Sequence, residues 1–339
     1  MKFTRSKVLT FFNNKGGVGK TTLSYNCSVY FANLGYKVCM IDLDPQCNLT
    51  RLAIGEENLE NSIFANSSNT IFNVIEGIVA AKSDVDITIK PEKITKNERG
   101  LYILRGDQRL SNYDDLLSGY YAQAAGGNEA GYRQISAISR YIKQLGMDDL
   151  FDIFVIDTSP TLGSLNKIIL LDTDYFVVPV NPDAFSLQGI ENLGVKLEEW
   201  KKNWKNTGQA LAGKMPSELV LKGEGLFMGY ILNSYNVYAK KLIKNHNKWA
   251  QLIPDKVRVY LSERHSRNGL VVSSSVNALG NIQDYGLMPA KCQEESKALF
   301  ELDPETIANN QVGTKENIEK SKVEFELLCN NILNILHKY

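Results

Sequence analysis

A run of glycines, lysines and threonines near the N-terminus has the composition and spacing of a phosphate-binding loop. It comprises Lys15, Gly16, Gly17, Val18, Gly19, Lys20, Thr21 and Thr22. Glycines let backbone N–H groups turn toward an anion, and the lysine before the two threonines can reach the β- and γ-phosphates. The first threonine hydroxyl can join the shell of a Mg²⁺ ion, and the N-terminus of a following helix adds partial positive charge. The pattern therefore predicts a site for a nucleoside triphosphate with Mg²⁺.

The loop departs from the usual pattern G-x-x-x-x-G-K-[ST] at its first position. Asn14 stands where that pattern requires a glycine, and Lys15 adds a second lysine inside the loop. A glycine-rich turn without a ligand is the alternative interpretation. Because the loop lies between an apolar run at 8–12 and an apolar-periodic segment from Leu23, the order strand, loop, helix favours the phosphate site.

Three aspartates follow apolar runs elsewhere in the chain. Asp42 and Asp44 end the run 37–41, and Asp157 ends the run 153–156. In α/β proteins ligands bind outside the carboxyl ends of the strands, so these carboxylates are expected in the same crevice as the phosphate loop. A carboxylate held at the end of a buried strand suits Mg²⁺, and we assign that role to Asp157 together with Thr21.

Short apolar runs alternate with helical patterns along most of the chain. Strands are expected at 8–12, 37–41, 101–104, 151–157, 175–180, 227–232 and 257–261, and helices at 23–34, 70–78, twice within 108–150 with a break at 124–131, and through 200 after the segment 181–189. This order predicts an α/β fold with a doubly wound, mostly parallel sheet. We expect a single domain over 1–339, with insertions at 55–100 and 200–225.

The C-terminal segment 315–338 is predicted to form an amphipathic helix. Its apolar side carries Ile318, Phe325, Leu328, Ile332, Leu333 and Leu336. A helix that docks on a membrane surface needs a polar face rich in Lys and Arg, whereas here glutamates and lysines are mixed. We therefore expect this helix to pack onto the body of the protein.

Charge is distributed unevenly along the chain. The 339 residues contain 38 Lys and Arg and 38 Asp and Glu, but the segment 196–267 contains 14 of the former and 6 of the latter, a net charge of +8. Such a segment could contact a phosphate backbone without sequence specificity. The candidate residues are Lys240, Lys241, Lys244, Lys248, Arg264 and Arg267. A solvated helix surface is the alternative.

Several of these motifs together resemble one family of ATPases. The stretch 15–21 resembles the deviant phosphate loop of the ParA/MinD family, 42–46 (DLDPQ) is similar to its D-x-D-P-Q motif, and 157–160 (DTSP) is similar to its D-x-P-P switch, with Ser159 in place of a proline. The strand and helix over 174–193 also resemble the family. We identify the chain as similar to ParA/Soj-type ATPases over most of 7–235.

The resemblance implies ATP and Mg²⁺ as ligands and a homodimer that sandwiches two nucleotides. Lys15 would reach the triphosphate of the other subunit, Asp44 would orient the attacking water, and Asp42 would support the Mg²⁺ shell and hold Lys15. Asn233 would contact the adenine. The implied function is a slow switch ATPase, stimulated by a ParB-like or cargo-adaptor protein, that binds non-specific DNA and drives DNA partition or cargo positioning.

The same scaffold is compatible with two other functions. The first is a MinD-like positioning ATPase on the membrane surface, which would use the C-terminal helix. The second is a metabolic or redox enzyme. A redox enzyme with an iron–sulfur cluster would need cysteines in the middle of the chain to bind the cluster. This class is excluded, because no cysteine lies between Cys47 and Cys292. The five cysteines lack the C-x-x-C spacing of zinc sites, and no apolar run reaches the roughly 18 residues of a membrane span. A cytoplasmic protein is expected, associated with the nucleoid if it binds DNA.

Overall fold

A mostly parallel β-sheet forms the centre of the molecule. The computed structural model describes residues 3–56, 59, 69–94, 100–235, 240–265, 278–304 and 314–339, with side chains for all of these except 234–235, 240–247 and 314. The described strands are β1 (Lys7–Phe11), β2 (Val38–Leu43), β3 (Glu92–Lys93), β4 (Leu101–Leu104), β5 (Ile153–Thr158), β6 (Tyr175–Val180), β7 (Leu226–Tyr235) and β8 (Ala278–Gln283). They lie in the order β3-β4-β2-β5-β1-β6-β7-β8, and only β3 runs antiparallel to its neighbour. The expected doubly wound α/β domain is confirmed.

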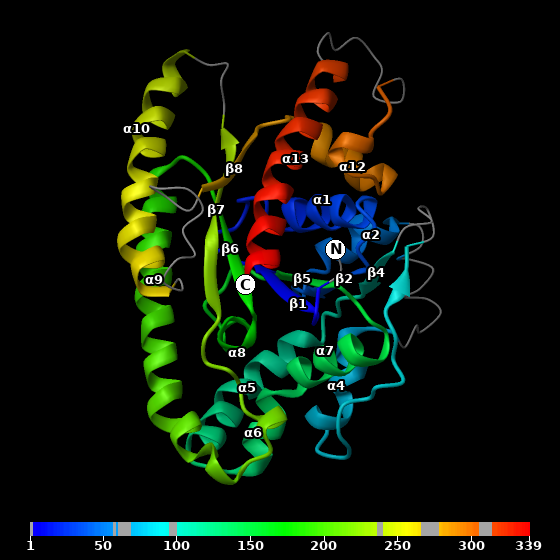
Figure 1. Ribbon diagram of the computed structural model, residues 1–339, viewed down its shortest axis with the longest axis vertical. Helices are drawn as coiled ribbons and strands as arrows, with labels where there is room; N and C mark the ends of the chain where they lie inside the picture. The colour runs from blue at the N-terminus through cyan, green and yellow to red at the C-terminus, as the bar shows by residue number, and fades with distance from the viewer. Residues whose placement is uncertain are drawn as a thin grey trace.

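Helices cover both faces of this sheet (Figure 1). They are α1 (Lys20–Asn33), α2 (Asn48–Ile54), α4 (Ile71–Val79), α5 (Leu110–Ala125), α6 (Glu129–Ile135), α7 (Ala137–Asp148), α8 (Ser164–Asp172), α9 (Ala184–Trp204), α10 (Lys240–Val257), α11 (Glu263–His265), α12 (Met288–Glu295) and α13 (Thr314–Lys338). In Figure 1, α1, α12 and α13 lie on one side of the sheet and α4, α5 and α7 on the other. The apolar side chains form two clusters, one on each face.

The strand sequences explain this layering. Along β2, Cys39 and Ile41 pack into one cluster, and Val38 and Met40 into the other. Successive side chains of a strand point to opposite faces, so a strand covered on both faces must be apolar throughout. This is why β2, β5 and β6 could be recognised as uninterrupted apolar runs.

The strand expected at 257–261 is wrong. This stretch is the end of α10 and a turn of π-helix (Arg258–Ser262). The side chains of Ile253, Val257 and Leu261 are all fully buried at a spacing of four residues, which is helical periodicity. The last strand, β8, was missed instead, because only Leu279 and Ile282 of its six residues are buried.

The segments expected to be irregular or amphipathic contain defined elements. Within 55–100 the described residues form α4 and β3, and within 200–225 they form the end of α9 and short π- and 3₁₀-helical turns. Residues 108–150 form three helices, because the second expected helix is interrupted at Ser136. The C-terminal helix α13 packs its apolar side against β8 and α1, as expected.

Candidate functional site

The phosphate loop connects β1 to α1 and depends on glycine at two positions. Gly17 and Gly19 have φ angles of 72° and 83°, a conformation that other residues rarely adopt. A Cβ atom at Gly19 would lie 2.3 Å from Nδ2 of Asn233. That Nδ2 donates a hydrogen bond to the carbonyl oxygen of Val18 over 2.9 Å. Asn233 thus braces the loop from the end of β7, and its contact with adenine stays a prediction.

Thr21 and Asp157 meet where α1 begins and β5 ends. Thr21 Oγ1 donates a hydrogen bond to Asp157 Oδ2 over 2.7 Å, while the buried Oδ1 has no hydrogen-bond partner among the described residues. Burial and the neighbouring charge of Asp42 raise the pKa of Asp157 to about 8, although the bond from Thr21 opposes this. The Thr21 hydroxyl and the second oxygen of Asp157 are oxygen ligands, and the neighbouring carboxylate of Asp42 adds negative charge. This combination suits a hard divalent cation such as Mg²⁺.

Asp42 lies beside this pair and is completely buried. The register of β2 and β5 sets Asp42 opposite Asp157. Asp42 Oδ2 accepts hydrogen bonds from N and Oγ1 of Thr50 over 2.8 and 2.7 Å, and Oδ1 accepts one from the Asp44 amide over 3.2 Å. Burial raises the pKa of Asp42 to about 6, against these bonds. Its carboxyl group is therefore rigidly held next to the proposed cation site.

Lys20 and Asp44 complete the polar lining. Lys20 is 7% exposed, and its Nζ donates a hydrogen bond to the Lys15 carbonyl oxygen over 3.3 Å. Burial lowers the pKa of Lys20, while the charges of Asp157 and Asp44 oppose this shift. Asp44 Oδ1 accepts a hydrogen bond from the Gln46 amide over 3.0 Å. Because the Lys20 ammonium is already largely removed from water, binding a phosphate oxygen there requires water to be removed mainly from the phosphate.

A cavity of about 530 Å³ opens over the phosphate loop, which is within the usual size range of ligand sites. Its lining comprises Gly16, Gly17, Gly19, Lys20, Thr21, Thr22, Asp44, Gln46, Asn48, Leu52, Pro160, Pro289, Ala290 and Gln293. The last three belong to α12 and were missed in the sequence, where no motif marks them. Only the folding of the chain brings α12, which is distant from the phosphate loop in the sequence, to the edge of the site.

Lys15 lies at the rim of the site but not against Asp42. Its ammonium forms an ion pair with Asp183, which follows β6 and also accepts a hydrogen bond from the Ser186 amide over 2.9 Å. Partial burial alone would raise the pKa of Asp183, but the bonds from Lys15 and Ser186 outweigh burial and lower this pKa below its ordinary value. The expectation that Asp42 holds Lys15 is therefore wrong for this structure. The carboxylate of Asp42 is already used by Thr50.

The candidate DNA-binding residues are only partly described. Arg267 lies outside the described residues, and so do the side chains of Lys240, Lys241 and Lys244. Lys248 is exposed, with its ammonium over the ring of Trp249. Arg264 is engaged in an ion pair with Glu198, and Lys256 pairs with Glu191 over 2.7 Å. Part of the positive charge of this region is thus neutralised within the protein.

Known proteins share both the sequence and the fold of this chain. Residues 6–209 match the model of a family described as AAA domain. A virulence plasmid ParA family protein of Chlamydia psittaci is 27% identical over 273 residues, which are 71% of this chain and 93% of that protein. The sporulation initiation inhibitor protein Soj of Bacillus subtilis is 24% identical over 266 residues, 77% and 89% of the two chains.

Two solved structures extend this likeness. A protein of Corynebacterium diphtheriae superimposes with a TM-score of 0.69 at 25% identity, covering 97% of this chain and 98% of its own. The pNOB8 ParA bound to nonspecific DNA has the same fold, with a TM-score of 0.52 at 17% identity over 98% and 99% of the two chains. No described helix is both long and apolar enough to cross a membrane. With the family match over 6–209 and the phosphate loop in place, the chain belongs to the AAA domain family of ParA/MinD-like P-loop ATPases, as a ParA/Soj-type member.

Proposed function

We propose that the protein is an ATP-dependent switch that dimerises with MgATP, hydrolyses it slowly and binds DNA without sequence specificity in the ATP state. The observation that carries this proposal is the cavity over the phosphate loop. It gathers Lys20, Thr21 and Asp44, with Lys15 paired to Asp183 at its edge. One lysine lies inside the site and a second lies beside it, free to serve another subunit once it leaves Asp183.

Within one subunit, the loop amides and Lys20 would bind the β- and γ-phosphates. Thr21 and Asp157 would hold Mg²⁺ and Asp42 would support its shell of water; when bound, Mg²⁺ would neutralise charge on the phosphate oxygens. Asp44 lines the same cavity and would orient the attacking water.

Lys15 would act across the dimer interface. A fixed cation that reaches the γ-phosphate from the other subunit stabilises the charge that develops during phosphoryl transfer, as an arginine finger does. Turnover would then require two subunits. A ParB-like or cargo-adaptor partner could accelerate hydrolysis by stabilising this closed arrangement.

DNA binding is supported by the net charge of +8 over 196–267 and by the solved relative bound to nonspecific DNA. Because Arg264 and Lys256 are paired with acids, the exposed Lys248 on α10 is the better candidate. Docking on a membrane through α13 is not favoured, since Phe325, Leu328 and Ile332 are completely buried in the core.

The test is size-exclusion chromatography and salt-titrated binding to random-sequence DNA. The wild type with MgATP should form a dimer and bind DNA, and binding should weaken steeply as salt rises. Asp44→Ala should remain dimeric for longer with ATP, whereas Lys20→Ala should stay monomeric and fail to bind DNA. DNA binding that is equal with ATP, with ADP and in Lys20→Ala would refute the switch.

A further inference from the structure

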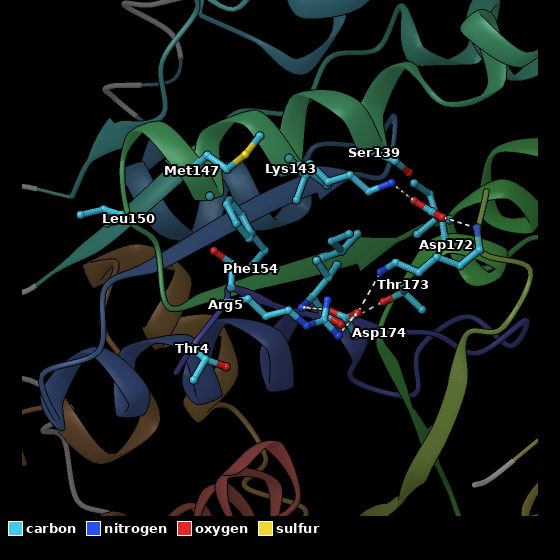
Figure 2. Close-up of a pocket in the computed structure, with 17 residues that line it drawn as sticks. Thr4, Arg5, Ser139, Lys143, Met147, Leu150, Phe154, Asp172, Thr173 and Asp174 are labelled. Atoms are coloured by element: carbon cyan, nitrogen blue, oxygen red, sulfur yellow. Dashed lines mark hydrogen bonds and ion pairs between the residues drawn. The ribbon is translucent and has the colours of Figure 1, made fainter. Parts of the chain in front are cut away.

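A second cavity, of about 550 Å³, lies at the opposite end of the sheet from the phosphate loop. Its lining comes from the residues before β1, one face of α7, the end of α8 and the segments that precede β6 and β7, together with side chains of β1 and β5 (Figure 2). These are the N-terminal ends of parallel strands, whereas the nucleotide site lies at their C-terminal ends. None of the residues that line one cavity lines the other. This cavity is thus separate from the ATPase site.

One end of this cavity is apolar. Ile142, Phe154 and Ile169 form buried walls, each at most 4% exposed. Met147 and Leu150 stand at the edge and are 66% and 73% exposed. Figure 2 shows Met147, Leu150 and Phe154 together at this end. A ligand with an apolar body would remove these side chains from water.

The other end carries five charged side chains. Asp174 Oδ2 accepts a hydrogen bond from the Val8 amide over 2.9 Å, and Oδ1 lies 2.8 Å from Lys222 Nζ and 3.2 Å from Arg5. Asp172 Oδ1 accepts a hydrogen bond from the Lys222 amide over 2.6 Å. Both carboxylates are therefore already engaged by the protein.

Two of the cations, Lys143 and Arg5, can still donate hydrogen bonds to a ligand. Lys143 Nζ lies 3.5 Å from Asp172 Oδ2, longer than a normal hydrogen bond, and no other contact within the described residues engages this ammonium. The side chain of Arg5 is 61% exposed and meets Asp174 through one nitrogen. Three cations, Arg5, Lys143 and Lys222, face two carboxylates, so the cavity has one uncompensated positive charge.

We propose that this cavity binds a small amphiphilic monoanion, with an apolar chain or ring against Met147, Leu150 and Phe154 and a carboxylate between Lys143 and Arg5. The volume matches ligand sites in general, and the separation of an apolar end from a cationic end matches the two parts of such a molecule. A charged hydrogen bond from Lys143 or Arg5 to the carboxylate orients the ligand along the cavity.

Calorimetric titration of the nucleotide-free full chain with decanoate, below the concentration at which it forms micelles, tests the proposal. We expect saturable binding of one decanoate per chain, weaker binding of the uncharged decanol and none of decyltrimethylammonium. Because nucleotide is absent, the result is independent of the proposed switch function. No saturable binding of decanoate, or equal binding of the cationic analogue, would overturn the proposal.

Variants locate the site. Met147→Glu places a carboxylate at the exposed apolar edge and should weaken decanoate binding by at least about tenfold, and Arg5→Gln or Lys143→Met by about tenfold each. Leu327→Glu is the matched control, because Leu327 is 58% exposed on α13, away from the cavity. Because the three variants lie at two different walls of the cavity, α7 and the segment before β1, a folding defect in one of them does not decide the result, and thermal melts would reveal such a defect. Unchanged affinity in both Met147→Glu and Arg5→Gln would place the binding elsewhere and refute the assignment.

Discussion

Thr21 Oγ1 donates a hydrogen bond to Asp157 Oδ2 over 2.7 Å and so joins the first turn of α1 to the end of β5. The two residues are far apart in the chain, and burial together with the charge of Asp42 raises the pKa of Asp157. The second oxygen of Asp157 has no partner among the described residues. Lys20 offsets only part of the negative charge of Asp42, Asp44 and Asp157, so we expect the site to favour an added cation and the stability of the protein to depend on pH.

We expect stability to fall as pH rises toward about 8 in the absence of nucleotide. The pKa of Asp157 is raised to about 8 in the folded protein, above its value in the unfolded chain. The folded state then binds more protons than the unfolded state between these values, so the free energy of unfolding decreases with pH in that window. Thermal melts from pH 5 to 9 should show a smaller decrease for Asp157→Asn than for the wild type. Parallel curves would contradict the raised pKa.

The carboxyl group of Asp157 should make nucleotide affinity depend on pH in the opposite direction to stability. Cation binding requires the ionised carboxylate, so the affinity for MgADP should increase as pH approaches about 8. Asp157→Asn should lose most of this dependence and bind weakly at every pH. Titration of a fluorescent ADP analogue with and without Mg²⁺ at each pH measures this affinity. A wild-type affinity that does not change with pH would argue against Asp157 as the cation ligand.

Lys15 and Lys20 should separate hydrolysis from binding. Lys20→Ala removes a buried ammonium inside the cavity and should abolish measurable ATP binding. Lys15→Ala should leave ATP affinity within about threefold but reduce kcat by a factor of about 10³ or more, the effect of removing a finger-type cation. Equilibrium binding and steady-state phosphate release give the two quantities. Equal loss of binding in both variants would refute the role of Lys15 in trans.

Releasing Lys15 from Asp183 should favour the dimer. Asp183→Asn removes the ion pair but keeps a side-chain oxygen that can accept the Ser186 amide at the start of α9. A partly exposed pair contributes about 0–1 kcal/mol and two such pairs open in each dimer, so we expect the dimerisation constant with ATP to increase by up to about thirtyfold. Analytical ultracentrifugation checks this. Asp183→Ala controls for loss of the helix cap, and a lower dimer fraction in Asp183→Asn would mean that the carboxylate is needed in the dimer itself.

A double-mutant cycle can test the contact that closes the loop. In Gly19→Ala the new methyl group would collide with Asn233 and the residue would keep a φ of 83°, so we expect a lower melting temperature and weak ATP binding. Asn233→Ala removes the collision but not the backbone strain, which costs about 1 kcal/mol or more. The double variant should therefore melt above Gly19→Ala but below Asn233→Ala. Additive effects would show that the two residues do not touch.

The local pattern of residues determined the parts of this protein that depend on neighbours in the chain. Glycines at 16, 17 and 19 with Lys20 and Thr21 were sufficient to predict a phosphate loop, because its backbone conformation and its helix are both local. Uninterrupted apolar runs were sufficient to predict β2, β5 and β6, because strands covered on both faces must be apolar. The family resemblance rests on these same local motifs.

Only the tertiary structure decided how distant segments meet. The pair of Lys15 with Asp183, the position of α12 beside the nucleotide cavity and the cavity at the opposite end of the sheet depend on the order of strands, which no local pattern encodes. The stretch 257–261 was misread for a related reason: its β-branched and aromatic residues favour a strand locally, but burial of Val257 and Leu261 against the neighbouring helices stabilises a helix. Packing outweighs local propensity wherever a segment has one face to bury.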